Sequence, residues 1–570
     1  MYSSKENVNI LTALLVKHGI NHAVVCPGSR NAPIVHNLNE CPAITCHPAS
    51  DERSAAFYAL GMAQATDNAV AVCVTSGTAL LNVAPAVAEA YYQHQAIIVI
   101  AADRPQQWID QLDGQTLPQP DALGRFVGKA VTLPEPTNDE ERWYCNRLVN
   151  EALIEATDEV AKPVLINVPI SEPLFSFDTT ALPDERHIVR SRPATDYCSL
   201  HKQLIEGMMK AQRPMIVFGQ ANPNHYDRSG VDYLFGHVIV LHEQLSSFPH
   251  ISHFDEVLSK YADDDTLLPD FIIHVGDAIV SKRLRHFLRR ANNAVTWRIS
   301  PSGKVEDSFM NLCGIVVGDE EFVLQALNDK LRYINISRPA AEYRRRWLRL
   351  LSAASRHADL YVPQFSQMAA VKELESQIRD VSSGMADAFA KPVTVHYANS
   401  SAIRLANIYA QHHVWCNRGV NGIEGSLSTA AGFSVVSGEM VVCVIGDLSF
   451  FYDQNALWNK CLYKGSHRGN LRILLLNNGC GGIFSQLPGL EHSSAAASLV
   501  AAAHNTTAEG ICRQNGVEYL VACDTEELPK AIRHLLTADS SRPILLEVVT
   551  SAAADRRAID DYYSTLSLAT

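Results

Sequence analysis

The sequence lacks the features of a membrane, secreted or nucleic-acid-binding protein. No apolar run approaches the roughly 20 residues that a helix needs to cross a bilayer. Residues 1–7 lack the basic-then-apolar order of a secretory signal. No long cluster of lysine and arginine occurs, and the net charge is −13 with a pI near 5.9. We therefore expect a cytoplasmic protein without membrane insertion and without nucleic acid as a partner.

Two cofactor signatures are also missing. The 13 cysteines are scattered, and Cys73 and Cys443 lie in apolar segments, as reduced buried thiols do. Cys41 and Cys46 are close together, but no second pair completes a zinc-binding spacing. The middle third has Gly276-Asp277 after an apolar segment but no Gly-x-Gly-x-x-Gly, so a dinucleotide site there is poorly supported.

The pattern that is present indicates an α/β protein. At 570 residues the chain is too long for one core, and 47% hydrophobic and 19% charged residues are an ordinary globular balance. Apolar strands alternate with amphipathic helices, which is typical of parallel sheets covered on both faces. The expected strands are 22–26, 69–75, 96–101, 163–168, 215–219, 237–241, 271–276, 295–299, 315–317, 414–417, 440–445, 471–476 and 544–549. The expected helices are 51–65, 78–93, 340–355 and 371–390.

We therefore predict three consecutive, doubly wound parallel-sheet domains at residues 1–180, 195–355 and 370–570. The polar stretch 178–194 is interpreted as a linker between the first two. The run Arg344-Arg345-Arg346 falls in an amphipathic helical segment, and we expect it to form a solvated face.

Two strand ends in the last third carry the main chemical signal. The strand 440–445 ends in Gly446-Asp447, and the strand 471–476 ends in Asn477-Asn478 before a glycine-rich turn. Asp447 and Asn478 would supply hard oxygen ligands, and the turn would bring a carbonyl and free N–H groups close to phosphates. Each feature alone is ordinary turn chemistry, but the combination favours a divalent metal holding a diphosphate.

Two segments of the first third add weaker signals. Glu52 leads an apolar helix with small residues, although an acid there also simply suits the positive helix end. The segment Thr75-Ser76-Gly77-Thr78 joins a strand to a helix, where an anion site and a helix cap are equally compatible with the sequence.

These motifs resemble those of thiamine diphosphate (ThDP) enzymes, with Leu448 in place of the usual third glycine. An ordered set of motifs further resembles the 2-succinyl-5-enolpyruvyl-6-hydroxy-3-cyclohexene-1-carboxylate (SEPHCHC) synthase family of menaquinone biosynthesis. The set comprises residues 26–30, 51–53, 75–78, 102–105, 399–404, 417–419, 422–425, 427–432, 446–453 and 477–484. The resemblance runs through nearly the whole chain.

The resemblance implies ThDP and Mg²⁺ or Mn²⁺ as cofactors. Glu52 would be the catalytic carboxylate beside the aminopyrimidine ring, and Asp447, Asn478 and the backbone carbonyl of Cys480 would bind the metal. The family usually has a small residue, often glycine, at position 480. A tighter φ requirement at Cys480 would therefore be expected to alter metal affinity. The implied cofactor-binding residues are Glu52, Thr75, Ser76, Gly77, Gly422, Ile423, Gly446, Asp447, Leu448, Ser449, Asn478, Ile483 and Phe484.

The implied reaction decarboxylates 2-oxoglutarate and adds the succinyl carbanion equivalent to isochorismate in a 1,4 sense, which makes the protein a transferase. Guanidinium groups suit the carboxylates of both substrates. The implied substrate-binding residues are Ser29, Arg30, Arg104, Gln115, Lys282, Arg283, Ser400, Arg404 and Arg418. Lys282 and Arg283 lie among other basic residues, so a solvated face is the alternative, and Ile423 could be ordinary core.

In this superfamily Glu52 and Asp447 of one site would come from different chains, which implies a homodimer or a dimer of dimers. Three other functions stay open. An acetolactate synthase-like ThDP enzyme would have a small apolar acceptor pocket. A nucleotide-binding protein would have no use for Glu52, and an NAD-linked oxidoreductase would need the missing glycine fingerprint.

Overall fold

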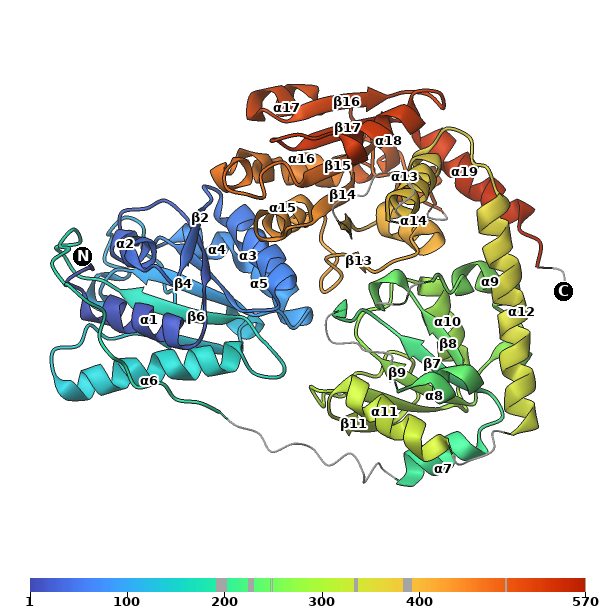
Figure 1. Cartoon of the computed structure of the whole chain (residues 1–570), viewed down its shortest axis with the longest axis horizontal. Helices are drawn as coiled ribbons and strands as arrows, with labels where there is room; N and C mark the ends of the chain where they lie inside the picture. The colour runs from blue at the N-terminus through green and yellow to red at the C-terminus, as the bar shows by residue number, and fades with distance from the viewer. Residues whose placement is uncertain are drawn as a thin grey trace.

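Three parallel sheets follow one another along the chain in the computed structural model (Figure 1). The structure describes residues 1–190, 202–223, 230–246, 248, 250–332, 337–382, 392–486 and 489–568. Helices cover both faces of the sheets, which confirms the predicted α/β class with three doubly wound units. Within these ranges, none of the helices combines the length and apolar character that crossing a bilayer demands.

The first sheet has the strand order β2-β1-β3-β4-β6-β5. Its strands are β1 (His22–Val25), β2 (Thr45–Pro48), β3 (Val70–Val74), β4 (Ile97–Asp103), β5 (Lys129–Thr132) and β6 (Val164–Pro169). Its helices are α1 (Glu6–Lys17), α2 (Ala32–Glu40), α3 (Glu52–Thr66), α4 (Thr78–Asn82), α5 (Ala84–Tyr92) and α6 (Asp139–Ala156). One face packs on α1, α2 and α6, and the other packs on α3 and α5.

The third sheet repeats this topology with the order β13-β12-β14-β15-β17-β16. Its strands are β12 (Val393–Tyr397), β13 (Val414–Trp415), β14 (Met440–Gly446), β15 (Leu471–Asn477), β16 (Glu518–Ala522) and β17 (Ile544–Val549). Its helices are α13 (Gln367–Ser382), α14 (Ser401–Tyr409), α15 (Ser426–Val436), α16 (Asp447–Tyr452), α17 (Glu509–Asn515), α18 (Leu528–Thr537) and α19 (Ala552–Thr565). The first and last units therefore share one strand order.

The second sheet has five strands in the order β11-β10-β9-β7-β8. They are β7 (Pro214–Phe218), β8 (Ile239–His242), β9 (Phe271–Val275), β10 (Val295–Ser300) and β11 (Leu312–Val317). Its helices are α7 (Lys202–Lys210), α8 (Asp232–His237), α9 (Phe254–Tyr261), α10 (Lys282–Arg290), α11 (Glu320–Leu331) and α12 (Arg338–Leu360). The domain boundaries predicted from the sequence remain a prediction.

Two element predictions were wrong in detail, and a third is tested only in part. The segment 78–93 forms two helices, because the chain turns at Val83 and restarts with Pro85 near the beginning of α5. His237 ends helix α8 and does not begin a strand. Helix α13 ends at Ser382, and residues 383–390 of the predicted helix lie outside the described residues. Of the predicted linker, residues 178–190 have little regular structure, and 191–194 are not described.

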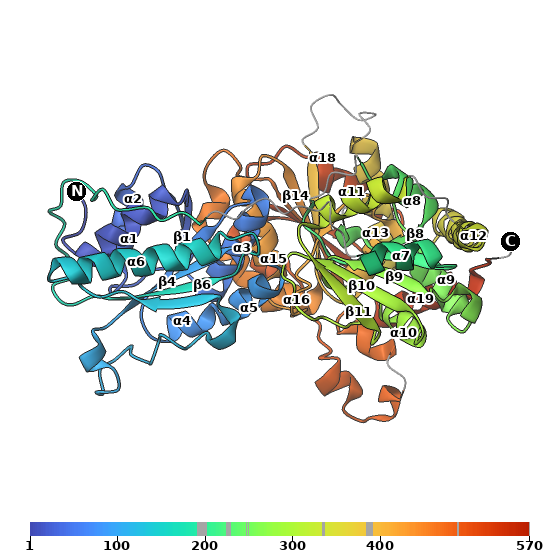
Figure 2. The same ribbon diagram turned by 90° about the horizontal axis from the view of Figure 1, so that it is seen from below.

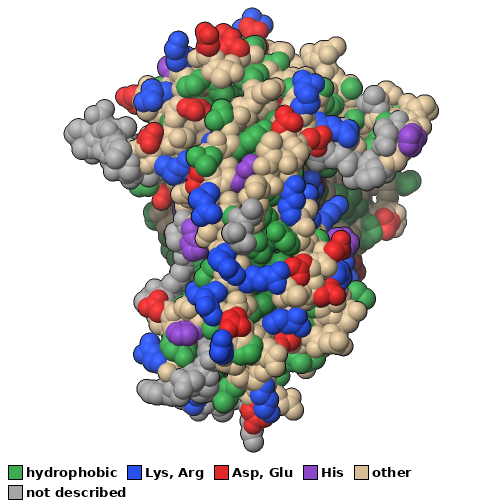
Figure 3. Space-filling view, turned by 90° about the vertical axis from the view of Figure 1, so that its right-hand side faces the viewer, with side chains coloured by type: hydrophobic (Ala, Val, Ile, Leu, Met, Phe, Trp, Pro, Cys, Tyr) green, Lys and Arg blue, Asp and Glu red, His purple; other side chains and the backbone are tan. Residues whose placement is uncertain are grey.

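The arginine run on α12 is only partly a solvated face. Arg345 is exposed, but Arg344 donates to the carbonyls of Phe235 and Val238, and Arg346 pairs with Asp264. Helices α12 and α19 lie along the side of the molecule that faces the viewer in Figure 3, where basic and acidic side chains are interspersed.

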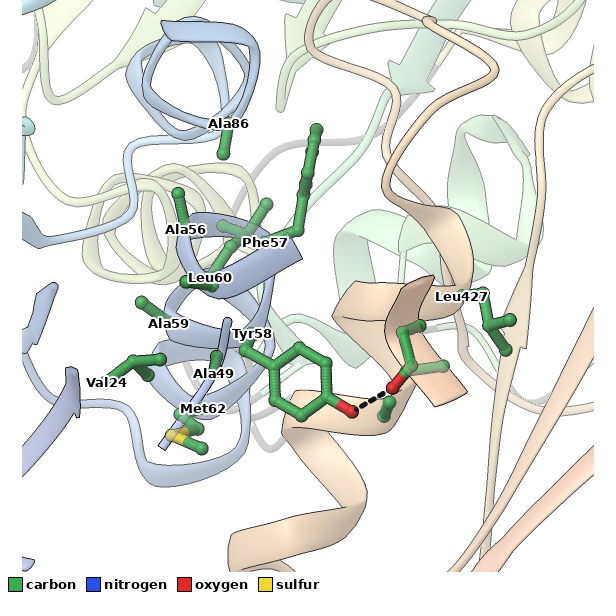
Figure 4. Close-up of a cluster of buried hydrophobic side chains, with 14 of the residues drawn as sticks. Val24, Ala49, Ala56, Phe57, Tyr58, Ala59, Leu60, Met62, Ala86 and Leu427 are labelled. Carbon is green, nitrogen blue, oxygen red and sulfur yellow. Dashed lines mark hydrogen bonds between the residues drawn. The ribbon is translucent and has the colours of Figure 1, made fainter. Parts of the chain in front are cut away.

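Helices α3 and α15 join the first and third units, and they lie side by side in both ribbon views (Figures 1 and 2). Gly61 and Gly432 permit this contact, because a Cβ at either position would collide with the backbone of the other helix. The Tyr58 hydroxyl crosses the interface to the carbonyl of Ala456 at 2.7 Å, within a buried apolar cluster (Figure 4). The two units thus share one core.

Candidate active site

Asp447 lies where two neighbouring strands end, and its carboxylate is bound by backbone. Strands β14 and β15 pair so that Gly446 faces Leu476, which brings the residues after each strand together. Oδ2 of Asp447 accepts the N–H groups of Asn478 and Gly479 at 3.1 and 2.9 Å. Oδ1 accepts that of Leu448 at 2.7 Å. Asp447 is 4% exposed, and this burial raises the pKa of its carboxyl.

The donor set fits a hard divalent cation. Among the described residues, the ion-pair partner of Asp447 is His504, whose Nε2 lies 3.5 Å from Oδ2 and is buried without a hydrogen bond. No fixed cation therefore balances this buried carboxylate within that part of the chain. The carboxamide oxygen of Asn478 accepts the N–H of Cys480 at 3.3 Å and the weak thiol donor of the same residue at 3.8 Å. Both contacts are long, so this oxygen can still serve as a ligand to a hard cation.

Cys480 is not a thiolate ligand candidate, as expected for a hard metal. Burial raises the pKa of its thiol, which favours the neutral form. The sequence predicts a tighter φ requirement at position 480. The positive φ is instead found at Gly479, at 74°, and Cys480 is not among the positive-φ residues of the described chain. A glycine therefore already occupies the position that needs one.

A second loop lies against this strand edge. Asn399 donates to the carbonyls of Asn417 and Gly422 at 2.7 and 2.8 Å, and the Ser449 hydroxyl donates to the carbonyl of Ile423. Ile423 is 45% exposed, so it is not ordinary core. The loop is thus tied both to the end of β12 and to the start of the helix that carries Asp447.

The same loop is also held by the first unit. Glu89 on α5 is buried, and its carboxylate accepts the N–H groups of Gly419 and Val420 at 2.6 and 2.7 Å. Burial raises the pKa of Glu89, and these hydrogen bonds oppose the rise. Arg418, just before them, donates to Asn399 at 3.0 Å, so Glu89 holds the backbone next to a predicted substrate-binding residue.

A cavity of about 610 Å³ opens beside Asn478 and Ile483. Its walls come from the second and third units, including α9, α10, α14 and α19. Three predicted substrate-binding residues, Lys282, Arg283 and Arg404, line it. Ser400, at the start of α14, has a φ of 76°, a strained conformation for a residue other than glycine and one that is often found at functional sites.

The basic residues of this region differ in their partners. Arg283 pairs with Asp255 and stacks on Tyr563, with the guanidinium carbon 4.7 Å from the ring centre. Lys282 and Arg404 make no hydrogen bond or ion pair with any residue that the structure describes. Within the described chain, the charged groups of Lys282 and Arg404 therefore remain available to bind a ligand in the cavity.

The alternative of one solvated basic face on α10 stays open, because Lys282, Arg283, Arg289 and Arg290 are all exposed. Arg289 donates to the carbonyl of Ser308, and Arg290 pairs with Asp263 and Asp265, all outside the cavity. Lys282 and Arg283, at the start of the helix, line the cavity instead. The helix thus divides its basic residues between two surroundings.

Glu52 begins helix α3 in the first unit. The Asp51 side chain caps this helix by accepting the N–H groups of Arg53 and Ser54 at 2.9 and 3.2 Å. Asp51 therefore takes the capping role, and Glu52 is left partly exposed with Asn82 at 3.5 Å. The charge of Glu52 adds to burial in raising the pKa of Cys26.

Two arginines of the first unit are already bound by protein. Arg30 is buried and donates to the carbonyl of Ile170 at 2.9 Å and to Glu172 at 3.1 Å. Arg104 donates to the carbonyl of Gly114 at 3.2 Å. Both lie where strands of the first sheet end, as the sequence predicts.

Both interpretations of the segment 75–77, as an anion site and as a helix cap, stay open. The N–H of Gly77 donates to the side chain of Gln119 at 2.8 Å, and Gly77 lies against the backbone of Gln115. The Thr75 hydroxyl is buried without a hydrogen bond in the described chain, so it has capacity for a further partner.

The predicted site residues thus fall into two groups, which we call the Glu52 half-site and the Asp447 half-site. The Glu52 half-site comprises Ser29, Arg30, Glu52, Thr75, Ser76, Gly77, Arg104 and Gln115, all in the first unit. The Asp447 half-site comprises Lys282, Arg283, Ser400, Arg404, Arg418, Gly422, Ile423, Gly446, Asp447, Leu448, Ser449, Asn478, Cys480, Ile483 and Phe484. The cavity of the Asp447 half-site has no lining residue from the first unit.

Sequence reasoning missed five acidic residues of the cavity: Glu243, Asp255, Glu256, Asp555 and Asp560. Glu243 directly follows strand β8, so the strand-end rule that found Asp447 could have found it. Its carboxylate accepts the N–H groups of Val280 and Ser281, and burial raises its pKa to about 7. The other four lie within helices α9 and α19 and carry no signal of that kind.

Comparison with protein families agrees with this geometry. Residues 6–123 match the thiamine pyrophosphate enzyme N-terminal TPP binding domain, and residues 398–548 match the corresponding C-terminal TPP binding domain. These two ranges include every residue of the two half-sites except Lys282 and Arg283, which belong to the second unit. The fold and site therefore define a ThDP-dependent enzyme of the transferase type.

Full-length relatives specify the family. The chain is 41% identical to SEPHCHC synthases of Bacteroides fragilis and Bacteroides thetaiotaomicron, with 99% of this chain and 100% of each relative covered. It is 39% identical to the SEPHCHC synthase of Phocaeicola vulgatus, with 99% of both chains covered. The chain belongs to the SEPHCHC synthase family.

Proposed function

We propose that the protein decarboxylates 2-oxoglutarate and adds the resulting succinyl unit to isochorismate, giving SEPHCHC and CO₂ in menaquinone biosynthesis. We place this activity in the cytoplasm. The family membership supports the proposal, since full-length relatives are named for this product.

The observation that carries the proposal is the cavity beside Asn478, whose wall includes Lys282 and Arg404. Lys282 and Arg404 point to anionic ligands, because they line it without protein partners in the described chain. Carboxylates of 2-oxoglutarate and isochorismate would satisfy such cations. The acetolactate synthase-like alternative requires a small apolar acceptor pocket, which this cavity is not.

Each half-site has a proposed role. Asp447, Asn478 and the Cys480 carbonyl would hold Mg²⁺ or Mn²⁺ with the diphosphate, and Glu52 would exchange a proton with the aminopyrimidine ring. Bound ThDP supplies the nucleophilic carbon and electron sink that 2-oxoacid decarboxylation requires. Ile423 would support the cofactor between its rings, because its side chain is exposed and its carbonyl is held by Ser449.

The substrate contacts divide between the units. Ser400 and Arg404 would bind the succinyl carboxylate, while Lys282 and Arg283 would face isochorismate. From the first unit, Arg30, Arg104, Ser29 and Gln115 would complete the isochorismate site, with Arg418 as a further polar contact. Arg30 and Arg104 already have protein partners, which would fix their orientation before substrate arrives.

We propose a homodimer, or a dimer of dimers, in which two chains complete each site. Support comes from the cavity, whose lining lacks the first unit, and from exposed apolar side chains near the half-sites. Trp108 and Leu112 in the first unit are 51% and 103% exposed, and Ile423 is also exposed. A facing subunit would cover them and bring Glu52 to the Asp447 half-site of its partner.

The test is CO₂ release from 2-oxoglutarate by purified protein with ThDP and Mg²⁺, with and without isochorismate. The proposal predicts release coupled to consumption of isochorismate, and no turnover of pyruvate. If ThDP binds but neither substrate reacts, the ThDP assignment stands and the substrate assignment fails. Turnover of pyruvate instead would favour the acetolactate synthase-like alternative.

A further inference from the structure

Asp555, in the first turn of α19, contacts a proposed metal ligand. Its Oδ2 accepts Nδ2 of Asn478 at 2.8 Å and the hydroxyl of Thr550 at 3.0 Å. Its Oδ1 accepts the backbone N–H of Gln367 at 2.8 Å, at the start of α13. Three donors from three segments therefore converge on one carboxylate.

This contact determines which end of the Asn478 carboxamide faces the metal site. A metal takes the carboxamide oxygen and not the nitrogen, yet the two ends have nearly the same shape. An ionised carboxylate only accepts hydrogen bonds, so the end of Asn478 that faces Asp555 has to be Nδ2. The oxygen is then left on the other side, toward the N–H of Cys480 at 3.3 Å.

We propose that Asp555 is a positioning residue that keeps the Asn478 oxygen directed at the metal. The inference rests on the proposed role of Asn478 as a metal ligand. Substitution of a residue that orients a metal ligand through a hydrogen bond typically lowers metal affinity by about 10- to 100-fold. Asp555 would act in this way from the C-terminal helix, 77 residues further along the chain than its target.

The neighbouring asparagine shows the same arrangement. Nδ2 of Asn477 donates to the buried carboxylate of Glu547 at 2.6 Å, and its Oδ1 accepts the N–H of Gly479 at 3.0 Å. Both members of the Asn477-Asn478 pair thus have their nitrogen held by a carboxylate and their oxygen turned toward the glycine-rich turn. Two separate carboxylates therefore specify the orientation of both amides.

The substitution Asp555→Asn tests the orientation with almost no change in shape. The backbone N–H of Gln367 cannot reorient, so the one remaining oxygen at position 555 would serve it. The new NH₂ group would then face Asn478 and accept nothing, which favours rotation of the Asn478 amide by half a turn. The Asn478 nitrogen would point at the metal.

The measurement is Mn²⁺ binding, followed by electron paramagnetic resonance of the free ion, in full-length protein with saturating ThDP and no substrate. Asp555→Asn is expected to raise the Kd by about 10- to 100-fold. Asp561→Asn is the matched control, because it makes the same change at an exposed position of the same helix. Its Kd should stay within about twofold of the unmodified protein, as expected for a surface change.

Three further variants make the outcome decisive. Thr550→Val removes a second hydrogen bond to the same Asp555 oxygen but leaves Asn478 held, so Mn²⁺ affinity should be retained. An equal loss in Thr550→Val would show that packing of α19, not amide orientation, sets the affinity, and would overturn the proposal. Asp555→Ala frees the amide altogether and covers the case in which Asp555→Asn does not fold, and unchanged affinity in it would also overturn the proposal.

Asn478→Ala separates the two levels of the argument. If it weakens Mn²⁺ binding and Asp555→Asn does not, Asp555 has no positioning role and the metal site stands. If Asn478→Ala also leaves the affinity unchanged, the metal assignment itself fails, and the role of Asp555 fails with it.

Discussion

Replacing Arg404 by methionine should weaken the use of 2-oxoglutarate without weakening the fold. Arg404 lines the cavity next to α19 and is exposed in the chain. It has no hydrogen bond or ion pair with the described residues. Asp255 attracts its charge, and Arg418 and Arg283 repel it, so the substitution removes opposing interactions and little net stability. Methionine keeps an unbranched side chain along the cavity wall and deletes only the charged fork.

The expected magnitude follows from one lost interaction with a carboxylate. Hydrogen bonds to charged groups contribute about 1.5–3 kcal/mol each. Since about 1.4 kcal/mol corresponds to a factor of ten, the KM for 2-oxoglutarate should rise roughly 10- to 150-fold. The contact is to the distal carboxylate, away from the reacting carbon, so kcat should change much less than KM.

Initial rates with varied 2-oxoglutarate at saturating isochorismate measure this effect. Arg404→Lys should recover part of the loss, because lysine keeps the charge but not the planar fork. Arg345→Met is the control, since Arg345 is 67% exposed on α12, and its partners among the described residues are Glu342 and a carbonyl of its own helix. The free energy of unfolding of Arg404→Met should stay within about 0.5 kcal/mol of the unmodified protein.

Two results would refute the reasoning. An unchanged KM for 2-oxoglutarate would remove Arg404 from the succinyl site. A raised KM for isochorismate alone would assign the residue to the other substrate, and the proposed division of contacts would need to be exchanged.

Three other substitutions test separate parts of the structure. Glu52→Gln should still bind ThDP but lose most activity, and turnover at the unmodified rate would exclude Glu52 as the activating carboxylate. Glu89→Gln replaces one acceptor of the loop that carries Arg418, so kcat/KM for isochorismate should fall about tenfold or more in steady-state assays; an unchanged value would contradict a positioning role. Burial raises the pKa of the Glu243 carboxyl in the folded protein to about 7. The stability that Glu243 contributes is therefore fully present below about pH 4.5 and is lost as the pH rises through 7. The unfolding free energy of the unmodified protein relative to Glu243→Gln should therefore fall by about 3 kcal/mol between pH 4.5 and pH 8, and a flat difference in denaturant titrations would show that Glu243 is not buried as described.

Most strands were predictable because their signal is local. A fully buried parallel strand is a short, nearly continuous apolar run, and β3, β4, β14, β15 and β17 all have that form. Strands β2, β5, β12 and β16 were not predicted. Three of them, β2, β5 and β16, lie at or next to a sheet edge and are partly exposed, so polar residues interrupt their pattern.

Local sequence patterns were enough to identify the residues at strand ends. Since all strands of a parallel sheet end at one edge, Asp447 and Asn478 had to meet once β14 and β15 paired. The same reasoning located Arg30, Arg104 and the segment 75–77 at the edge of the first sheet.

The interaction partners of these side chains, in contrast, depend on tertiary packing and could not be predicted. Among the described residues Arg283 has an ion-pair partner and Lys282 has none, Glu89 binds a loop 330 residues away, and Asp555 in the last helix accepts a hydrogen bond from Asn478. Such contacts depend on how whole units dock, and docking is set by packing of many residues far apart in sequence. A local sequence pattern cannot predict a hydrogen bond between two residues that become neighbours only when the chain folds.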